Sequence, residues 1–337
     1  MDEWLDYLED RGVDQHLAQS YFNYGCNLVD SGNPVIMELE HLARIVGIKL
    51  SILSSMIAQP ESFYRSFRIK KRRGGMREIS APYPSLLSCQ RWIYENILAS
   101  KPVHPCAHGF VRGRSIVSNA SCHLGKQMLL KMDIRGFFPS IPFAWVIKYF
   151  NSLGYAKNVS YYLASLCCLN RCLGQGAATS PALANILVYH LDVRLDALSK
   201  KCKITYTRYA DDLAFSGESI PLWFSETVSQ IVRNFGLQIN TDKTQLHQKS
   251  GKRVLTGISV AGSCLKLPRE ATRLLRKEIY FVRKFGILSH VINQKIRNPF
   301  YLQSLIGKFG FWLQIEPDNE FAKQAFDDLI NMAALRM

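Results

Sequence analysis

The amino-acid sequence predicts an α+β fold, and three observations support this interpretation. The chain has 337 residues, of which 47% are hydrophobic and 20% charged, as in an ordinary globular protein with its own core. Residues 105–260 mix strand-like alternation with helical periodicity. The flanking segments are mainly helical in pattern. We therefore expect a helical region over 1–60, a mixed region of strands and helices over 61–265, and a second helical region over 266–337.

The charge of the chain is strongly positive. Lys and Arg number 42 against 27 Asp and Glu, which gives a formal net charge of +15. Each phosphate that a protein neutralises releases a condensed counterion, so this charge favours a nucleic-acid partner. Charge alone leaves a ribosomal protein or a membrane-surface protein as alternatives.

Neither a membrane route nor a cysteine-based framework is predicted. The N-terminus is acidic, unlike the start of a signal peptide, and no apolar run reaches the roughly 18 residues of a spanning helix. The nine cysteines show no paired CxxC spacing, which argues against disulfides and structural zinc. His104, Cys106 and His108 alternate in a predicted loop without a second ligand cluster, and we interpret them as a coincidence. We expect a cytoplasmic protein without a membrane partner.

A basic hairpin is predicted directly after the N-terminal helices. Two alternating runs, 67–71 and 76–79, flank a turn that contains two adjacent glycines. The hairpin carries Lys70, Lys71 and Arg77 near this turn.

Three aspartates lie at the ends of predicted strands. Asp133 follows a strongly apolar run, and Asp211 and Asp212 interrupt the strand-like segment 204–215. Adjacent residues on a strand point to opposite faces, so a hairpin turn at Asp211 and Asp212 would let both carboxylates approach one site. Like charges this close oppose each other's ionisation, and a buried lone carboxylate needs a partner. Oxygen ligands suit Mg²⁺, with Mn²⁺ as a substitute.

Three carboxylates in this arrangement could hold two metal ions about 3.5–4 Å apart. One ion would activate a primer 3′-hydroxyl, and the other would hold a triphosphate and its leaving group. Asp211 and Asp212 alone would be equally consistent with an ordinary surface turn, so Asp133 is essential to this interpretation.

The order of these motifs resembles that of reverse transcriptases. Tyr209-Ala210-Asp211-Asp212 resembles their YxDD box, and Asp133 with Phe137-Phe138 resembles their first palm motif. Between them, residues 174–185 (GQGAATSPALAN) resemble a QGxxxSPxxxN motif. The resemblance covers about 63–260. It implies RNA-directed DNA polymerase activity and a right-hand polymerase with fingers, a palm of antiparallel sheet plus helices, and a helical thumb.

The resemblance also implies nucleotide-binding residues. Gln175 and Gly176 match positions that line the incoming nucleotide, where glycine permits close backbone approach. Gly174 and Ala178 stand where the family often has proline, which predicts a more flexible loop. Lys243 resembles a lysine that could donate a proton to pyrophosphate, with an ordinary surface lysine as the alternative.

The hairpin and the first palm motif supply further nucleotide-binding candidates. Lys71 and Arg77 match positions that clamp the triphosphate, and Lys70 could replace Lys71 in this role. Phe138 matches the steric gate that would exclude a ribonucleotide 2′-hydroxyl. Core packing is the alternative for Phe137 and Phe138, and we expect one of the two rings to do this.

Three further features resemble retron enzymes within this family. The segment 108–115 (HGFVRGRS) is typical of bacterial reverse transcriptases related to group II introns. Asn119 and His123 resemble the NAxxH signature of retron enzymes, and Leu255-Thr256-Gly257 resembles their VTG signature. We expect Asn119, His123, Thr256 and Gly257 to contact RNA. Helix capping and a buried, hydrogen-bonded histidine are the alternatives for Asn119 and His123.

The C-terminal region carries basic residues near helical spacing, with few acids nearby. Such a stripe could follow phosphates along an RNA duplex, while a solvated helix face is the alternative. The residues are Arg269, Arg273, Arg276, Lys277, Arg283 and Lys284.

A retron enzyme implies particular partners. These are a cognate structured non-coding RNA that serves as template and primer, dNTPs, the DNA product, and an effector protein in anti-phage defence. Synthesis would start from an RNA 2′-hydroxyl and give a branched RNA–DNA product. The alternatives are a solitary group II-like or other defence-associated reverse transcriptase, and a non-catalytic RNA-binding scaffold.

Overall fold

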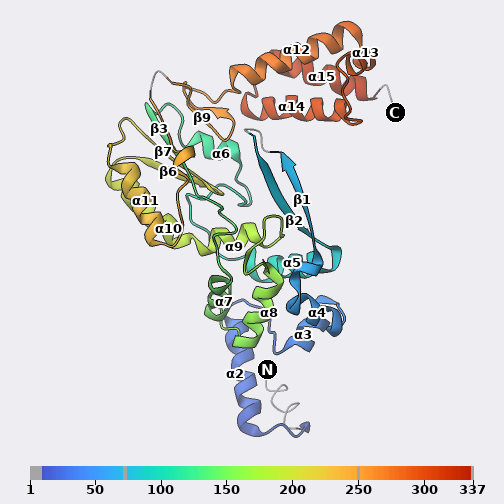
Figure 1. The fold of residues 1–337 in the computed structure, drawn as a ribbon, viewed down its shortest axis with the longest axis vertical. Helices are drawn as coiled ribbons and strands as arrows, with labels where there is room; N and C mark the ends of the chain where they lie inside the picture. The colour runs from blue at the N-terminus through green and yellow to red at the C-terminus, as the bar shows by residue number, and fades with distance from the viewer. Residues whose placement is uncertain (1–9, 71–73, 249–250, 335–337) are drawn as a thin grey trace. The chain divides into compact units, whose positions relative to one another are not determined.

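The computed structural model describes residues 10–70, 74–248 and 251–334. The chain forms two compact units, each assembled from segments that are far apart in the sequence. The first unit takes residues from 1–110, 134–195 and 228–240, and the second takes residues from 111–133, 196–227 and 241–337. The expected boundaries near residues 60 and 265 stay a prediction. Figure 1 shows the elements of both units.

The first unit is mainly helical. Pro at the first turn opens both α5 and α9, where its fixed φ suits a helix start. The helices of this unit are α2 (Gln15–Asp30), α3 (Leu39–Val46), α4 (Leu50–Ala58), η1 (Pro60–Phe63), α5 (Pro84–Ile93), η2 (Tyr94–Leu98), α7 (Phe143–Ser152), α8 (Lys157–Cys167) and α9 (Ser180–Leu187). Two more helices, α10 (Tyr189–Lys201) and α11 (Phe224–Asn234), have residues in both units.

The predicted basic hairpin is present in the first unit. Strands β1 (Tyr64–Lys70) and β2 (Met76–Pro82) pair antiparallel along their full length. Lys71 and the other residues of 71–73 lie outside the described residues. A second, two-residue pair is formed by β4 (Cys168–Leu169) and β5 (Cys172–Leu173).

No single helix in the described ranges has both the length and the apolar character needed to cross a membrane. Helices α3 and α4, bent by 112° at their junction, meet the length and composition criteria only when they are taken together.

The second unit is built around a four-stranded antiparallel sheet with the order β6-β7-β3-β8. Figure 1 shows β3, β6 and β7 side by side, with α6 next to them. Strand β3, one of the two inner strands, is apolar, and its residues Leu129, Leu130 and Met132 are each at most 2% exposed. The elements are α6 (Ile116–Ser121), β3 (Met128–Asp133), β6 (Thr205–Tyr209), β7 (Asp212–Gly217), η3 (Thr241–Lys243), β8 (Gln245–His247), β9 (Val254–Leu255) and β10 (Ile258–Ser259).

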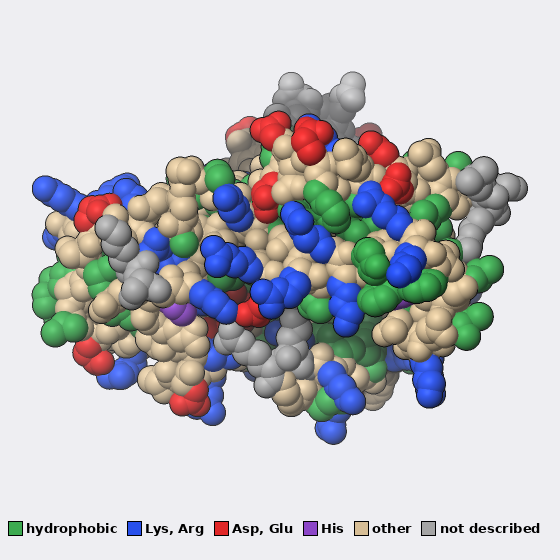
Figure 2. Space-filling view, turned by 90° about the horizontal axis from the view of Figure 1, so that it is seen from above, with side chains coloured by type: hydrophobic (Ala, Val, Ile, Leu, Met, Phe, Trp, Pro, Cys, Tyr) green, Lys and Arg blue, Asp and Glu red, His purple; other side chains and the backbone are tan. Residues whose placement is uncertain are grey.

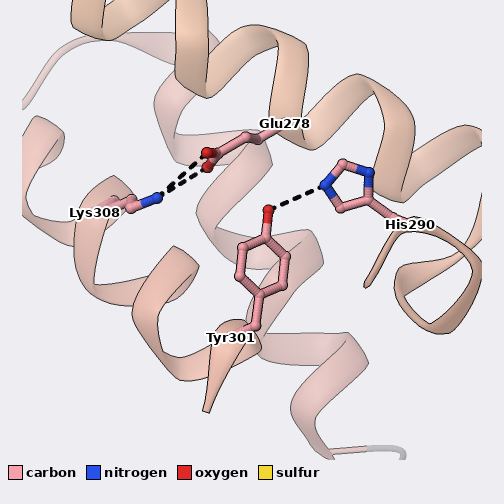
Figure 3. A network of polar contacts seen from close by, with 4 residues as sticks. All are labelled: Glu278, His290, Tyr301 and Lys308. Atoms are coloured by element: carbon pink, nitrogen blue, oxygen red, sulfur yellow. Dashed lines mark hydrogen bonds and ion pairs between the residues drawn. The ribbon is translucent and has the colours of Figure 1, made fainter. Parts of the chain in front are cut away.

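The C-terminal helices of this unit pack around an apolar core in which Ile279, Leu305 and Phe309 are fully buried, and the same core includes Leu129 of β3 and Ala214 of β7. The helices are α12 (Arg269–Phe285), α13 (Ile287–Asn293), α14 (Tyr301–Ile315) and α15 (Glu320–Ala334). Polar contacts also join them, as Figure 3 shows. Lys308 lies 3.1 Å from Glu278, and His290 Nε2 lies 3.2 Å from the Tyr301 hydroxyl.

Candidate active site

The three predicted aspartates lie together at one end of the palm sheet, the four-stranded sheet of the second unit. Asp133 is the last residue of β3 and pairs in register with Asp212, the first residue of β7. Asp211 lies in the two-residue turn that joins β6 to β7. Carboxylate oxygens of the three residues lie within 4.8 Å of one another. The strand register therefore brings together residues that are almost 80 positions apart in the sequence.

The turn that carries Asp211 has an unusual backbone. Ala210 has a φ of 56°, in the left-handed region that residues with a Cβ rarely adopt. A tight hairpin needs a positive φ in its loop, and here alanine supplies it. The Arg208 guanidinium, which is fully buried, donates a hydrogen bond of 3.3 Å to the Ala210 carbonyl. Arg208 is not among the predicted site residues, although a charged residue inside a strand-like run is a usable signal.

The carboxylates repel one another. Desolvation, and then the charges of Asp211 and Asp133, raise the pKa of Asp212 to about 6. Solvent still reaches the Asp212 side chain, so water screens part of this repulsion. A set of three carboxylates with oxygen donors only fits a hard divalent cation, which would relieve the repulsion.

A lysine compensates part of this negative charge. The Lys243 ammonium lies 2.7 Å from Oδ2 of Asp133, a carboxylate that is 6% exposed. Helix η3 places Lys243 two residues before the start of β8, which pairs with the same strand that Asp133 ends. The structure therefore brings Lys243 to the aspartates, and its role as a proton donor stays a prediction.

The predicted nucleotide-binding loop, which contains Gln175 and Gly176 and is called the Gln175 loop below, lies in the first unit. The backbone N–H of Ser80, on β2, donates a hydrogen bond of 2.9 Å to the Gln175 carbonyl. Gly176 has a φ of 127°, and a Cβ at this position would lie 2.6 Å from the Ser80 carbonyl oxygen. Glycine is therefore required here by both the backbone conformation and the close approach of β2.

Side chains from elsewhere in the first unit hold the same loop. The fully buried Gln90 accepts a hydrogen bond of 2.9 Å from the Ala178 N–H and donates to the Leu166 carbonyl. Ser180 donates a bond of 2.7 Å to the Gly174 carbonyl. Gln90 is not among the predicted site residues, although a polar residue on the apolar face of a helix is a usable signal.

The two phenylalanines of the first palm motif differ in burial. Phe137 is 4% exposed and packs in the core, whereas Phe138 is half-buried. Phe138 is therefore the accessible ring, as a steric gate requires. Its neighbours are the Phe137 ring at 5.5 Å and the Phe110 ring at 6.2 Å between centroids. The motif residue Asn185 donates to the carbonyl of Gly109, directly before Phe110.

Arg77 lies on β2 opposite Ile69 and is exposed, so its guanidinium is accessible to a ligand. Lys70, the alternative to Lys71, is the last residue of β1 and is also exposed. The triphosphate-clamping role of these residues stays a prediction.

Comparison with known proteins identifies the family. A family model described as reverse transcriptase (RNA-dependent DNA polymerase) matches residues 69–260. The chain is 35% identical over 273 residues to the retron Mx65 reverse transcriptase of Myxococcus xanthus. The match covers 74% of this chain and 64% of the Mx65 enzyme. It is 32% identical over 266 residues to the retron Ec86 reverse transcriptase of Escherichia coli. This match covers 77% of this chain and 83% of the Ec86 enzyme. This chain belongs to the retron reverse transcriptases.

The α+β right-hand polymerase predicted from the sequence is confirmed as the fold class of this retron reverse transcriptase. The chain spans 64% and 59% of the lengths of two Myxococcus xanthus relatives, the retron Mx65 and Mx162 enzymes. A solved telomerase from Candida albicans, in complex with a fragment of telomeric RNA, has a TM-score of 0.44 and 12% identity. The structural match covers 79% of this chain and 62% of the telomerase chain.

The first retron signature lies inside the palm, not on its surface. Asn119 and His123 are each 1% exposed, which corrects the expectation that their side chains contact RNA. His123 Nδ1 lies 2.6 Å from the Ser216 hydroxyl, and its Nε2 lies 2.7 Å from the Thr207 hydroxyl. Thr207 in turn donates a hydrogen bond of 2.6 Å to Asn119 Oδ1. The alternative of a buried, hydrogen-bonded histidine therefore describes this structure.

The chain of hydrogen bonds determines the direction of each bond. A hydroxyl has one hydrogen, and Thr207 gives its hydrogen to Asn119, so it must accept from His123 Nε2. In the neutral ring, Nδ1 is then the acceptor for the Ser216 hydroxyl. Thr207 lies on β6 and Ser216 on β7, so one histidine ties both strands of the aspartate hairpin to the segment that follows α6.

The second retron signature forms a surface turn. Leu255 pairs with Ile258, and the two loop residues Thr256 and Gly257 have φ values of 47° and 89°. Two successive positive φ values are those of a type I′ hairpin turn. Gly257 is exposed, so the turn is accessible to RNA, and the predicted contact stays a prediction. The Thr256 hydroxyl lies 3.5 Å from the carbonyl of Ile116, on α6.

The predicted basic stripe on α12 is narrower than expected. Arg276 lies with its guanidinium 4.4 Å from the centroid of the Phe321 ring, and Arg283 forms an ion pair of 2.7 Å with Asp328. Both therefore pack against α15. Arg273, Lys277 and Lys284 share another face by helical spacing, whereas Arg269 stands seven residues before Arg276 and lies on the same side of the helix as it. Figure 2 shows Lys and Arg side chains gathered across the middle of the face that it draws, among hydrophobic side chains.

The His123 network gives a prediction about stability. Thr207→Val removes a hydroxyl that both donates and accepts, which leaves His123 Nε2–H and Asn119 Oδ1 buried without this partner. We expect the free energy of unfolding to fall by about 1–3 kcal/mol in urea titrations. Thr205→Val, at a half-buried position of the same strand, is the control. Unchanged stability with weakened RNA binding would instead favour direct RNA contact.

The nucleotide-binding loop gives a second prediction, with a matched control two residues away. Gly176→Ala puts a Cβ against the Ser80 carbonyl and should lower the free energy of unfolding by about 1–3 kcal/mol. Gly174→Ala meets only ordinary contacts of 3.5–3.9 Å and should be tolerated. Thermal unfolding of both variants measures the difference. Equal melting temperatures would show that the loop can move away from β2.

Proposed function

We propose that this chain is an RNA-directed DNA polymerase that copies a cognate structured non-coding RNA into single-stranded DNA, msDNA. The observation that carries this proposal is the cluster of Asp133, Asp211 and Asp212 within 4.8 Å at the end of an antiparallel sheet. Membership of the retron reverse transcriptases supports it. The retained carboxylates argue against a non-catalytic RNA-binding scaffold.

The aspartates would hold two Mg²⁺ ions. Bound there, the ions would activate the attacking hydroxyl and neutralise the charge of the triphosphate and its leaving group. Asp133, Asp211 and Asp212 supply the oxygen ligands, and the β3–β7 register keeps Asp133 opposite Asp212. Lys243, already within 2.7 Å of Asp133, donates a proton to the departing pyrophosphate.

Residues of the first unit bind the incoming nucleotide. Gln175 and Gly176 line the nucleotide, with Gly176 giving its backbone a close approach. Phe138 presents its accessible ring to the sugar and excludes a 2′-hydroxyl. Lys71 and Arg77 bind the triphosphate through charge-assisted hydrogen bonds.

The retron signatures and the basic face of α12 support the choice of template. Thr256 and Gly257 contact the RNA from an exposed turn, while Asn119 and His123 act by positioning the aspartate hairpin. The exposed face of α12 binds RNA phosphates. From the family resemblance we extend the proposal to a 2′-hydroxyl primer, an effector protein and a role in anti-phage defence.

Catalysis is tested by the double variant Asp211→Asn, Asp212→Asn. Loss of the metal ligands should reduce Mg²⁺-dependent DNA synthesis on RNA about 10³-fold or more, because several kcal/mol of charge stabilisation are lost. RNA affinity should change by less than about threefold in binding titrations, because the RNA contacts lie elsewhere. Asp242→Asn, which alters an exposed carboxylate next to Lys243, is the control. A wild-type protein that incorporates no dNTPs with its co-purified RNA would favour the scaffold.

Branched priming is tested on the DNA product itself. If synthesis starts from an RNA 2′-hydroxyl, the product carries a 2′,5′ linkage, and debranching enzyme should shift its mobility on a denaturing gel. DNA made by the same protein from an annealed primer with a 3′-hydroxyl is the control and should not shift. Unchanged mobility of the native product would leave the polymerase but remove the retron mode of priming.

A further inference from the structure

The first unit contains a pocket of about 700 Å³ that shares no residue with the aspartates, the Gln175 loop or Phe138. Its volume is within the range of about 300–1,000 Å³ that is typical of small-molecule sites. The wall combines aromatic rings with cationic side chains, and none of its residues is acidic. The residues that carry the argument are Lys101, Trp145, Lys148, Tyr149, Tyr189 and Phe235.

Helix α7 supplies much of this wall. Trp145, Lys148 and Tyr149 stand at positions i, i+3 and i+4, so they lie on one face of the helix. The Trp145 ring packs edge-on against Phe235 at 5.4 Å between centroids. The rings of Trp145, Tyr149, Tyr189 and Phe235 belong to half-buried residues, so each has a supported side and an accessible side.

One of the two cations is held in place. The Lys101 ammonium donates a hydrogen bond of 2.6 Å to Asn33 Oδ1, and Asn33 is 4% exposed. Asn33 is itself fixed by a bond of 3.1 Å from its Nδ2 to the Leu153 carbonyl. An ammonium has three N–H donors, so Lys101 can still donate to an anion while it keeps this bond. Lys148 is exposed and adds a second positive charge.

The pocket wall also contains an unsatisfied polar atom. The Tyr149 hydroxyl is buried and has no hydrogen-bond partner among the residues that the structure describes. Buried polar groups without partners are rare in proteins, but this hydroxyl is closed to solvent and a ligand could reach it only if neighbouring side chains moved, so the chemistry of the ligand is inferred from the rings and the cations. Aromatic rings and two cations together call for a ligand with a flat ring and negative charge.

We propose that this pocket binds a nucleotide, with its base against the aromatic side chains and its phosphate at Lys101 and Lys148. Stacking on aromatic side chains combined with cations for phosphate is how proteins bind unpaired nucleotides. The nucleotide is either free or part of an unpaired segment of an RNA or DNA strand. The inference goes beyond the proposed reaction, because none of these residues takes part in it.

The experiment measures binding of 5′-AMP by calorimetry to the full chain carrying Asp211→Asn and Asp212→Asn, in EDTA. These conditions remove nucleotide binding that depends on metal at the aspartates. The result does not depend on DNA synthesis, so failure of the polymerase proposal would not affect it. We expect adenosine, which lacks the phosphate, and ribose 5-phosphate, which lacks the base, each to bind at least tenfold more weakly than AMP.

Matched variants locate the site. Lys148→Glu reverses an exposed charge in the pocket and should raise the dissociation constant for AMP at least tenfold. Lys157→Glu makes the same change at an exposed lysine outside the pocket and should leave the constant within twofold. Trp145→Leu, checked for folding by its melting temperature, tests the aromatic wall and should also weaken binding at least tenfold.

A second arm identifies the source of the nucleotide. A six-residue oligoadenylate that binds at least tenfold more tightly than AMP, and loses this affinity in Lys148→Glu, identifies an unpaired strand. Equal affinity for AMP and the oligonucleotide identifies a free nucleotide. The inference is overturned if neither ligand binds, or if Lys148→Glu and Lys157→Glu affect both ligands equally.

Discussion

The mutual repulsion of three carboxylates within 4.8 Å is the constraint on which the architecture of the palm depends. Burial first, and then the charges of Asp211 and Asp133, raise the pKa of Asp212, and without metal the structure must hold the hairpin against this repulsion. Antiparallel pairing does most of this, because the register of β3 with β7 fixes Asp133 opposite Asp212 along six residue pairs. The buried Arg208 then holds the carbonyl of Ala210 at the turn, and Lys243 neutralises part of the charge on Asp133. The electrostatic repulsion within the cluster is thus opposed by contacts at several places along the sheet.

The same hairpin is held from its other end by the retron signature. His123 bonds to hydroxyls on both β6 and β7, so a shift of either strand along the other would break one of the two bonds. A capping box between Ser115 and Ser118 fixes the start of the short helix α6, which carries Asn119. The LTG turn reaches the same helix through Thr256. Both signatures therefore converge on α6, which would physically connect an RNA contact at the exposed turn to the aspartates.

The aspartates could be predicted from the sequence, but the residues that hold them in place could not. Alternation of apolar residues predicts strands, and a carboxylate at the end of one strand and a pair in a hairpin are visible without a structure. The partners of His123 are not visible, because Thr207 and Ser216 lie 84 and 93 residues away and look like ordinary small residues of a strand. Burial of Asn119 likewise follows from tertiary packing that a single sequence does not encode locally. Helical spacing on α12 gave the basic residues but not the position of α15, which occupies Arg276 and Arg283.

The Gln175 loop shows how a departure from a family pattern can be compensated. Proline at position 178 would restrict the backbone but would have no N–H. Ala178 has an N–H. The side chain of the buried Gln90 accepts a hydrogen bond of 2.9 Å from it and donates another to the Leu166 carbonyl. The backbone at Ala178 is thus restrained by a hydrogen bond to a neighbouring helix. The sequence alone predicted a more flexible loop because the loss of proline is local, whereas its replacement lies 88 residues away. Gly176 needs this support, since its contact with β2 leaves no room for the loop to shift toward the strand.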